Sequence, residues 1–474
     1  MNYWLSLIIS SVLGFLCVNI FRARNRIDPA LHLIASLGLG MALSAHIIFY
    51  TLFTVGQYNA GFIWFLHAAL FLILLTASLR GPQAKAIANL GLLRRLRAPH
   101  RPATCLPWLR HGAGQGRSRG RRNDKILWLG IGILALLLVP LWREANFYPF
   151  GGWDAWACWN LKSKFIFLGQ ENWKNMLDPL MWRSNNQYPF LLPLMNVWGW
   201  NFYGSFSPLV PMFNTILFTF LTAMLMFVSL RRLNGKLFSV VPPLVLFTIP
   251  FINTLSISQY SDIVLAFYLL GSFVFLIAAH EKKNIALAIL AGCFCGIMSF
   301  TKTEGTLASV VIAGLSVPYF WKNKNTQPLL GPFLGAVAVS SLPTVLFQLF
   351  WAPENTSFIN GLTSPSNPVT FVRLKMIFIF LCVELISPKW TGLWVLLMCG
   401  LLLGKIRSFK NGLGIVPAFL VLYLGCTLAY YLINTHYEII WWLQNTLNRV
   451  LYTALPTIVW WIFYALWSEQ KKTT

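Results

Sequence analysis

Long apolar runs separated by short polar segments recur along the whole 474-residue chain. A helix needs roughly 20 apolar residues to cross a hydrocarbon core of about 30 Å. Runs of that length predict an all-α polytopic integral membrane protein with about 13 transmembrane helices. We expect these helices at 3–20, 31–54, 60–79, 126–142, 207–230, 237–257, 262–279, 284–300, 306–321, 329–351, 390–404, 413–433 and 450–467.

Two further segments have patterns typical of helices that lie at the outer membrane interface. Residues 371–388 combine apolar side chains with Arg373, Lys375 and Glu384, as an amphipathic surface helix does. The stretch FYPFGGWDAWACWNLKSKF, 147–165, should turn at its glycine pair and then start a helix near Trp153. At about 100° per residue, one face of that helix carries Asp154, Cys158, Leu161 and Phe165, and the opposite face carries Trp156, Trp159 and Ser163.

The composition fits this prediction, since 57% of the residues are hydrophobic, 11% are charged and the mean hydropathy is +0.63. The net charge of +24 would suit a nucleic-acid ligand, but its distribution indicates a membrane. With the N-terminus outside and the C-terminus in the cytoplasm, the cytoplasmic loops hold 27 of the 37 lysines and arginines. The basic charge therefore indicates orientation and contact with anionic membrane lipids, and no nucleic-acid partner is expected.

The segment 80–125 differs from the rest of the chain because it is strongly basic and includes the low-complexity run GAGQGRSRGRR. Its composition predicts a disordered cytoplasmic linker. The linker divides the chain into an N-terminal three-span bundle, 1–79, and a larger membrane core, 126–474. The core carries nearly all of the charged residues that we expect outside the cytoplasm.

The polar groups of the core gather in outer loops, each at or close to the end of a span. A transporter would be expected to bury ionisable groups near the middle of the bilayer, where the later spans have almost none. The one-sided arrangement therefore favours a cavity at the outer surface. The clusters are Asp154 with Lys162 and Lys164, NNQYPFLLP at 185–193, QYSD at 259–262, TKTEG at 301–305 and HYEIIWWLQNTLNR at 436–449.

Carboxylates and cations at an outer membrane surface suit transfer from a lipid carrier, because nucleotide donors are not available outside the cell. A polyprenyl-phosphate sugar places its phosphate at the headgroup level, where Lys or Arg neutralises the charge of the leaving group. A carboxylate beside the anomeric carbon would deprotonate the hydroxyl or amine of the acceptor. The pattern predicts a glycosyltransferase with an extracytoplasmic site.

In the order of its motifs, the chain resembles bacterial glycosyltransferases of the GT-C superfamily, in the branch related to protein O-mannosyltransferases and lipid A aminoarabinose transferases (family 39-like). The motifs are GGWDAWACWNLK, QYPFLLP, QYSDIVLAFYLL, GIMSFTKTEG and WWLQNTLNR, within about residues 126–460. The resemblance implies a GT-C-like helical bundle in the bacterial inner membrane and a polyprenyl-phosphate sugar donor. On this basis we expect an inverting reaction on a lipid, glycan or protein acceptor, and no cofactor is firmly implied.

The same resemblance implies the roles of the candidate site residues. Asp154 becomes the essential carboxylate after the first core span and the general base of the reaction. The other candidates are Lys162, Lys302 and Arg449 for binding the donor phosphate, and Asp262, Glu304, Tyr188 and His436 as supporting polar residues.

Two positions depart from the family pattern. Ala155 follows Asp154, where some relatives have a second acidic residue, and Gln187 precedes Tyr188, where relatives often have one. Each departure removes a carboxylate, so these residues argue against a divalent metal.

Three other functions remain open from the sequence. A polysaccharide ligase or polymerase would use a diphosphate-linked donor and rely on arginines and a histidine in a late outer loop, where only His436 and Arg449 fit. A transporter or flippase of lipid-linked sugars would retain translocation after the charge of Asp154 is neutralised. A structural scaffold would explain the hydrophobicity but not the one-sided charge.

Overall fold

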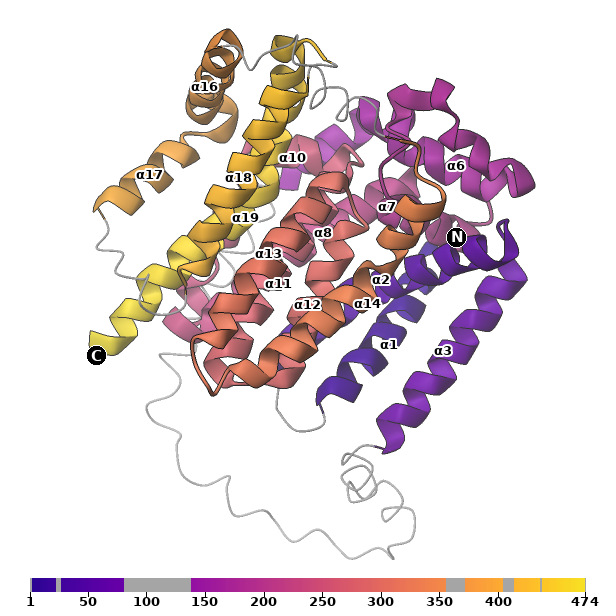
Figure 1. The fold of residues 1–474 in the computed structure, drawn as a ribbon, viewed down its shortest axis with the longest axis horizontal. Coiled ribbons are helices and arrows are strands. Elements are labelled where there is room, and N and C mark those ends of the chain that lie inside the picture. The colour runs from indigo at the N-terminus through magenta and orange to yellow at the C-terminus, as the bar shows by residue number, and fades with distance from the viewer. Residues whose placement is uncertain are drawn as a thin grey trace, which may run out of the picture.

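The computed structural model describes residues 2–22, 27–80, 138–354, 371–403, 413–434 and 437–473. These residues form helices joined by turns and loops, and none of them lies in a strand. The long helices run beside one another in a bundle, and several short helices gather at one of its ends (Figure 1). The predicted linker beyond Arg80 lies outside the described residues, as does most of the predicted span at 126–142.

Eight helices of the described chain are long and apolar enough to cross a membrane, by length and composition. Each coincides with a predicted span, so the prediction of a helical membrane protein is confirmed. They are α1 (Tyr3–Arg22), α2 (Pro29–Val55), α3 (Ala60–Arg80), α8 (Leu209–Phe238), α11 (Ser261–Lys282), α14 (Leu330–Phe350), α18 (Ile415–Ile433) and α19 (Ile439–Thr473).

The other five predicted spans are not among these eight helices, so the number 13 is not confirmed. Of the span at 126–142, only 138–142 are described, in a helical stretch at 138–147. The span at 237–257 is divided in two, because Pro250 lacks the N–H that would continue the preceding helix. The helices at these five positions are α9 (Val241–Phe247), α10 (Pro250–Ile257), α12 (Ile285–Ser299), α13 (Thr303–Trp321) and α17 (Leu393–Leu403), besides 138–147.

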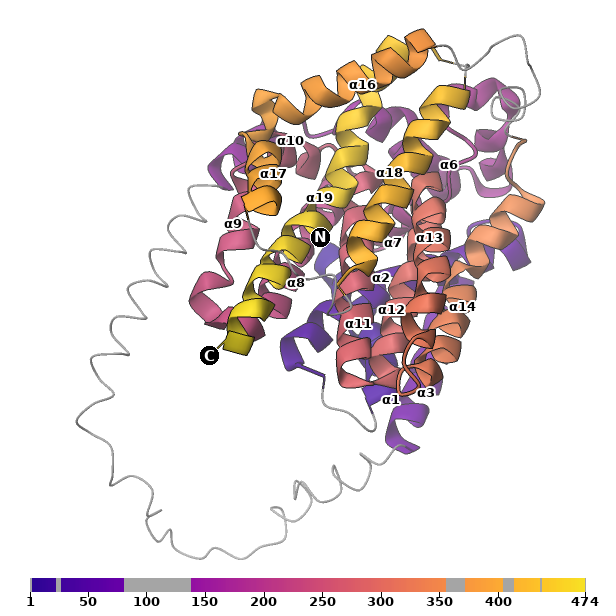
Figure 2. The same cartoon turned by 60° about the vertical axis from the view of Figure 1, so that its left-hand side comes forward.

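The remaining helices are short. The helix expected at 371–388 is present as α16 (Phe371–Ile386), which lies across one end of the bundle (Figure 2). The sequence pattern did not predict α7 (Leu191–Tyr203), whose residues from Leu191 to Trp200 are all buried. The others are η2 (Ala155–Trp159), α6 (Asn160–Leu168), η3 (Gln170–Leu177), η4 (Pro179–Ser184), η5 (Gln327–Leu329) and η6 (Pro388–Trp390).

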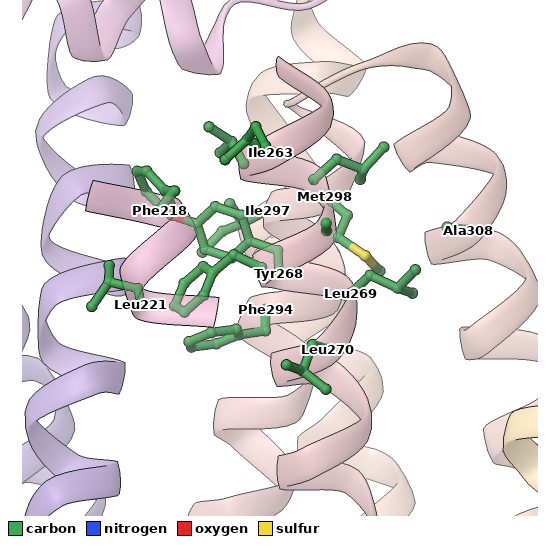
Figure 3. Close-up of a cluster of buried hydrophobic side chains, with 14 of the residues drawn as sticks. Phe218, Leu221, Ile263, Tyr268, Leu269, Leu270, Phe294, Ile297, Met298 and Ala308 are labelled. Atoms are coloured by element: carbon green, nitrogen blue, oxygen red, sulfur yellow. The ribbon is translucent and has the colours of Figure 1, made fainter. Parts of the chain in front are cut away.

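The core of the bundle forms around α11, which packs against α8, α12 and α19. Figure 3 shows Tyr268 of α11 beside Phe218 of α8 and Phe294 of α12. The ring of Tyr268 lies 5.8 Å from that of Phe218 and 5.4 Å from that of Phe294, within the range of favourable aromatic pairs. Its hydroxyl donates to the carbonyl of Gly38 at 2.8 Å, which connects α2 to this core.

Helices α1 and α2 pack with their backbones in contact. A Cβ atom on Gly14 would lie 1.9 Å from the carbonyl oxygen of Ser36, and one on Gly40 would lie 1.8 Å from that of Ser10. Small residues permit this close approach between membrane helices. Both helices also pack on α7, so the first helices contact the core directly. The predicted division after residue 79 stays a prediction.

Residues that the sequence places on the same side of the membrane contact each other at the same end of the bundle, and such contacts occur at both ends. At one end, Asp28 before α2 pairs with Arg231 at 2.7 Å and Arg232 at 3.0 Å, both from α8. At the other end, Arg373 of α16 donates to the carbonyl of Tyr431 near the end of α18 at 2.9 Å. Which end faces the cytoplasm stays a prediction.

Candidate functional site

Asp154 lies in an ion pair with a residue 295 positions away. The Nη1 atom of Arg449, from α19, donates to Oδ2 of Asp154, and the two side chains are 13% and 20% exposed. We had expected 436–449 to form an outer loop, but α19 already begins at Ile439 and carries Arg449 inside the helix. A continuous helix gives Arg449 a fixed direction toward Asp154.

The helix after Asp154 starts with a π-helical turn, η2, and continues as α6. Trp156 is 54% exposed whereas Trp159 is 1% exposed, so the expected common face of these tryptophans is wrong. The π-helix bonds residues five apart and is wider than the α-helix that we assumed. The wider turn changes the direction of each side chain after Asp154, as π-turns often do at functional sites.

Lys302 lies between two carboxylates. Its Nζ is 3.1 Å from Oδ1 of Asp262, in the first turn of α11, and 3.0 Å from Oε1 of Glu304, in the first turn of α13. Burial alone would lower the pKa of Lys302, but the two carboxylates raise it above its ordinary value. Lys302 is therefore a permanent cation that joins the starts of two helices.

The buried thiol of Cys158 lies near members of both ion pairs. Burial raises the pKa of this thiol to about 11, and Lys162, Asp154, Lys302 and Arg449 are all close enough to influence it. The predicted charges therefore converge in one place, which we call the charged cluster. The cluster contains three carboxylates and three cations, so its formal net charge is zero. The carboxylates are Asp154, Asp262 and Glu304, and the cations are Lys162, Lys302 and Arg449.

Lys162 differs from the other cations because it contacts no carboxylate in the described part of the chain. Its Nζ donates to the carbonyls of Asn185 at 2.7 Å and Tyr188 at 3.0 Å. The rings of Trp159, Tyr188 and Phe190 lie within 5.8 Å of the same atom. Burial lowers the pKa of Lys162 to about 8. Lys162 holds the loop before α7, and its role as a phosphate ligand stays a prediction.

Replacing Lys162 with methionine is expected to change how stability depends on pH. A free lysine has a pKa near 10.4, so between pH 8 and about 10.4 the unfolded chain binds the proton that folded Lys162 has lost. The free energy of unfolding of the wild type should rise relative to Lys162→Met across this window, by on the order of 3 kcal/mol. Thermal unfolding followed by tryptophan fluorescence measures this difference. Lys164→Met is the control, and a pH-independent difference for Lys162→Met would contradict the prediction.

Tyr188 connects Lys162 with the other cations of the charged cluster. Its ring stacks on Trp159, with centroids 5.5 Å apart, and lies 5.8 Å from Nζ of Lys302. Burial raises its pKa well above the ordinary value. Tyr188 is thus placed beside the cluster, as expected for a supporting residue, whereas His436 lies outside the described residues.

Several polar atoms in and around the charged cluster have no hydrogen-bond partner among the described residues. They include Oδ2 of Asp262, Oε2 of Glu304, Nε of Arg449 and the hydroxyl of Tyr423. Buried polar atoms normally have partners, so ordered water or a bound molecule is the expected partner of these groups. Tyr423 of α18 was missed from the sequence, since a tyrosine within an apolar run carries no local sign of its distant neighbours.

Within the described ranges, no three histidine, cysteine or acidic side chains are grouped as metal ligands. No family model matches the chain, and neither a curated protein nor a solved structure matches it.

Proposed function

We propose that the chain is a membrane glycosyltransferase that transfers a sugar from a polyprenyl-phosphate donor to an acceptor at the extracytoplasmic face. The observation that supports this most is the pairing of Asp154 with Arg449 beside buried polar atoms that lack partners. Such a partly exposed carboxylate next to a cation suits chemistry in which one proton and one phosphate are handled together. Eight apolar helices of the described chain are long enough to cross a membrane, which is compatible with a donor carried on a lipid.

In the proposed reaction, Asp154 is the general base. Arg449 occupies Oδ2, and Oδ1 accepts no hydrogen bond from the described residues, so Oδ1 is the oxygen proposed to take the proton of the acceptor hydroxyl or amine. The acceptor atom forms a bond with the anomeric carbon while the bond from that carbon to the phosphate oxygen breaks. The electron pair leaves with the phosphate. Attack on the face opposite the leaving group inverts the anomeric centre.

The phosphate is proposed to contact the N–H groups of Arg449 that Asp154 does not use. Nε of Arg449 is buried without a partner, and a guanidinium can bind a carboxylate and a phosphate on different edges. Lys302 already neutralises two carboxylates, so it supports the position of Asp262 and Glu304 more than it attracts a further anion. This refines the expected phosphate-binding role of Lys302.

The donor class tests the proposed function. Membranes containing the chain are incubated with radiolabelled polyprenyl-phosphate sugars, hexoses and pentoses, and in parallel with the same sugars on polyprenyl diphosphate. We expect transfer from the monophosphate donors to be at least about 100-fold faster, an amount that corresponds to about 2.7 kcal/mol. A requirement for the diphosphate donor would instead indicate a ligase or polymerase, and translocation without transfer would indicate a flippase.

A further inference from the structure

The turn that presents Asp154 is held by three consecutive residues from the end of α10. The N–H of Gly152 donates to the carbonyl of Ser258 at 3.1 Å, and the N–H of Asp154 donates to the hydroxyl of Tyr260 at 3.4 Å. Between these contacts, Nε2 of Gln259 donates to the carbonyl of Pro149 at 2.9 Å. The segment 258–260 therefore fixes the turn at 149–154 at three points.

The fit between turn and segment leaves no room for a side chain on the two glycines. Gly151 has φ 74°, in the left-handed region, and a Cβ atom there would lie 2.6 Å from the carbonyl oxygen of Ser258. A Cβ atom on Gly152 would lie 2.2 Å from the hydroxyl of Tyr260. The turn before Asp154 thus lies directly on the segment 258–260.

Gln259 holds both sides of Asp154. Besides its bond to Pro149, its Oε1 accepts from Nδ2 of Asn160 at 2.6 Å, the first residue of α6. Gln259 is fully buried and has φ 60°, a conformation that costs a residue other than glycine on the order of 1 kcal/mol. Its Nε2 also lies 3.5 Å from the carbonyl of Pro208, to which it donates a longer third bond. The backbone strain and these side-chain bonds together indicate that the conformation of this glutamine is determined by its contacts.

The contacts of Gln259 continue into a buried chain of hydrogen bonds that all run in one direction. The hydroxyl of Tyr3 donates to Asn214 at 2.7 Å, Asn214 donates to Asn196 at 2.9 Å, and Asn196 donates to Asn160 at 3.1 Å. Every member is at most 5% exposed. Fully satisfied buried networks rigidify their surroundings, and aligned bonds strengthen one another. The turn at Asp154 is therefore anchored to α1, α7 and α8.

We infer that Gln259 is the positioning residue that fixes the Asp154 carboxylate for reaction, supported by the chain Tyr3, Asn214, Asn196 and Asn160. This inference rests on the proposed role of Asp154 as the base. Gln259 contacts the carbonyl of Pro149 and the side chain of Asn160, so it is inferred to act on Asp154 through the segment 149–160. The first helix, α1, is then part of the catalytic unit through Tyr3.

Two substitutions of Gln259 test this inference in the transfer assay. Gln259→Leu removes all the side-chain hydrogen bonds of this residue and is expected to lower kcat about 30-fold, with KM changed less than about threefold, because small misplacements of a reacting group mainly affect the chemical step. Gln259→Glu keeps the acceptor for Asn160 but has no donor for Pro149 at pH 8. It should be about tenfold slower than the wild type at pH 8 and recover to within about threefold of the wild type at pH 5.5, because burial at this position raises the pKa of the introduced carboxyl and the protonated form donates again. Gln170→Leu is the control, since Gln170 also has a left-handed φ, 46°, but lies outside the network.

A measurement without turnover separates this inference from the proposed function. Spin labels at Trp153→Cys and Leu349→Cys, two exposed positions, report the distance between the Asp154 turn and α14 in a chain whose native cysteines are replaced. We expect the distance distribution to become at least about twice as wide in Gln259→Leu and to stay unchanged in Gln170→Leu. An unchanged width, or an unchanged kcat in Gln259→Leu, overturns the inference. If the wild type transfers no sugar at all, the proposed function fails. The widths of the distance distributions then test by themselves whether Gln259 positions the Asp154 turn.

Discussion

Asp154→Asn is expected to lower the rate of sugar transfer about 10³-fold. Asparagine keeps the size of the side chain and an oxygen that accepts from Arg449, but it takes no proton from the acceptor. General base catalysis contributes typically 10²- to 10⁴-fold, and this contribution is what the substitution removes. The measurement is transfer of radiolabelled sugar from polyprenyl-phosphate donors in membranes, normalised to the amount of protein by immunoblot.

Glu384→Gln is the matched control for Asp154→Asn. Glu384 also forms a partly buried ion pair, with Lys389 at 2.7 Å, and its side chain is 15% exposed compared with 20% for Asp154. It lies in α16, and its contacts are with Lys389 and the indole of Trp390 at 2.9 Å. We expect transfer within about twofold of the wild type. Wild-type transfer by Asp154→Asn at a normal protein level would rule out Asp154 as the base.

The convergence of the charged cluster could be predicted from the sequence because charge is expensive in a membrane. Asp154, Asp262 and Lys302 each follow or precede an apolar run, and an unpaired charge costs roughly 2.5–3.5 kcal/mol at the bilayer centre, which favours positions at the ends of the spans. Charges at the same depth are therefore expected to pair, and the structure brings Arg449 to Asp154 and Lys302 to Asp262. The sequence pattern alone did not distinguish which cation pairs with which carboxylate.

The contacts of Lys162 could not be predicted in this way. Its partners are backbone carbonyls at 185 and 188, and carbonyls carry no sequence signature because every residue has one. The same limit applies to Gln259. The hydrogen bonds of its side-chain amide depend on a left-handed backbone conformation that glutamine rarely adopts. Polar contacts with the backbone require the three-dimensional path of the chain.

Helix α7 escaped prediction for a different reason. Its 13 residues are too few for a span of roughly 20, so the length criterion passed over a helix that is buried inside the protein. The criterion assumes that an apolar run faces lipid, whereas Leu191–Trp200 face other helices. The span predicted at 237–257 is instead two short helices. The segment is apolar throughout, so a criterion based on hydrophobicity did not detect the break at Pro250.

Lys302→Met is expected to give the largest loss of stability. The substitution keeps much of the side-chain volume but leaves Asp262, whose side chain is 2% exposed, without the cation that compensates its charge. Removing one partner of a buried ion pair typically costs about 3–5 kcal/mol, because the remaining charge is buried and unpaired. Glu304, at 25% side-chain exposure, can still be solvated and should contribute less to this loss. Denaturant unfolding of the protein in detergent measures the change.

The double variant Lys302→Met with Asp262→Asn should therefore regain much of the stability that Lys302→Met loses. In the double variant the carboxylate of Asp262 is gone and only the partly exposed Glu304 is left without its cation, so the coupling energy between positions 302 and 262 should be on the order of 2 kcal/mol or more. Lys389→Met serves as the control, because Lys389 is 32% exposed and its pair with Glu384 should contribute less than about 1 kcal/mol. Equal losses in Lys302→Met and Lys389→Met, or no recovery in the double variant, would mean that water reaches Asp262 and that its charge is not held by Lys302. Recovery of stability without recovery of transfer would separate the structural role of this pair from the chemistry proposed for Asp154.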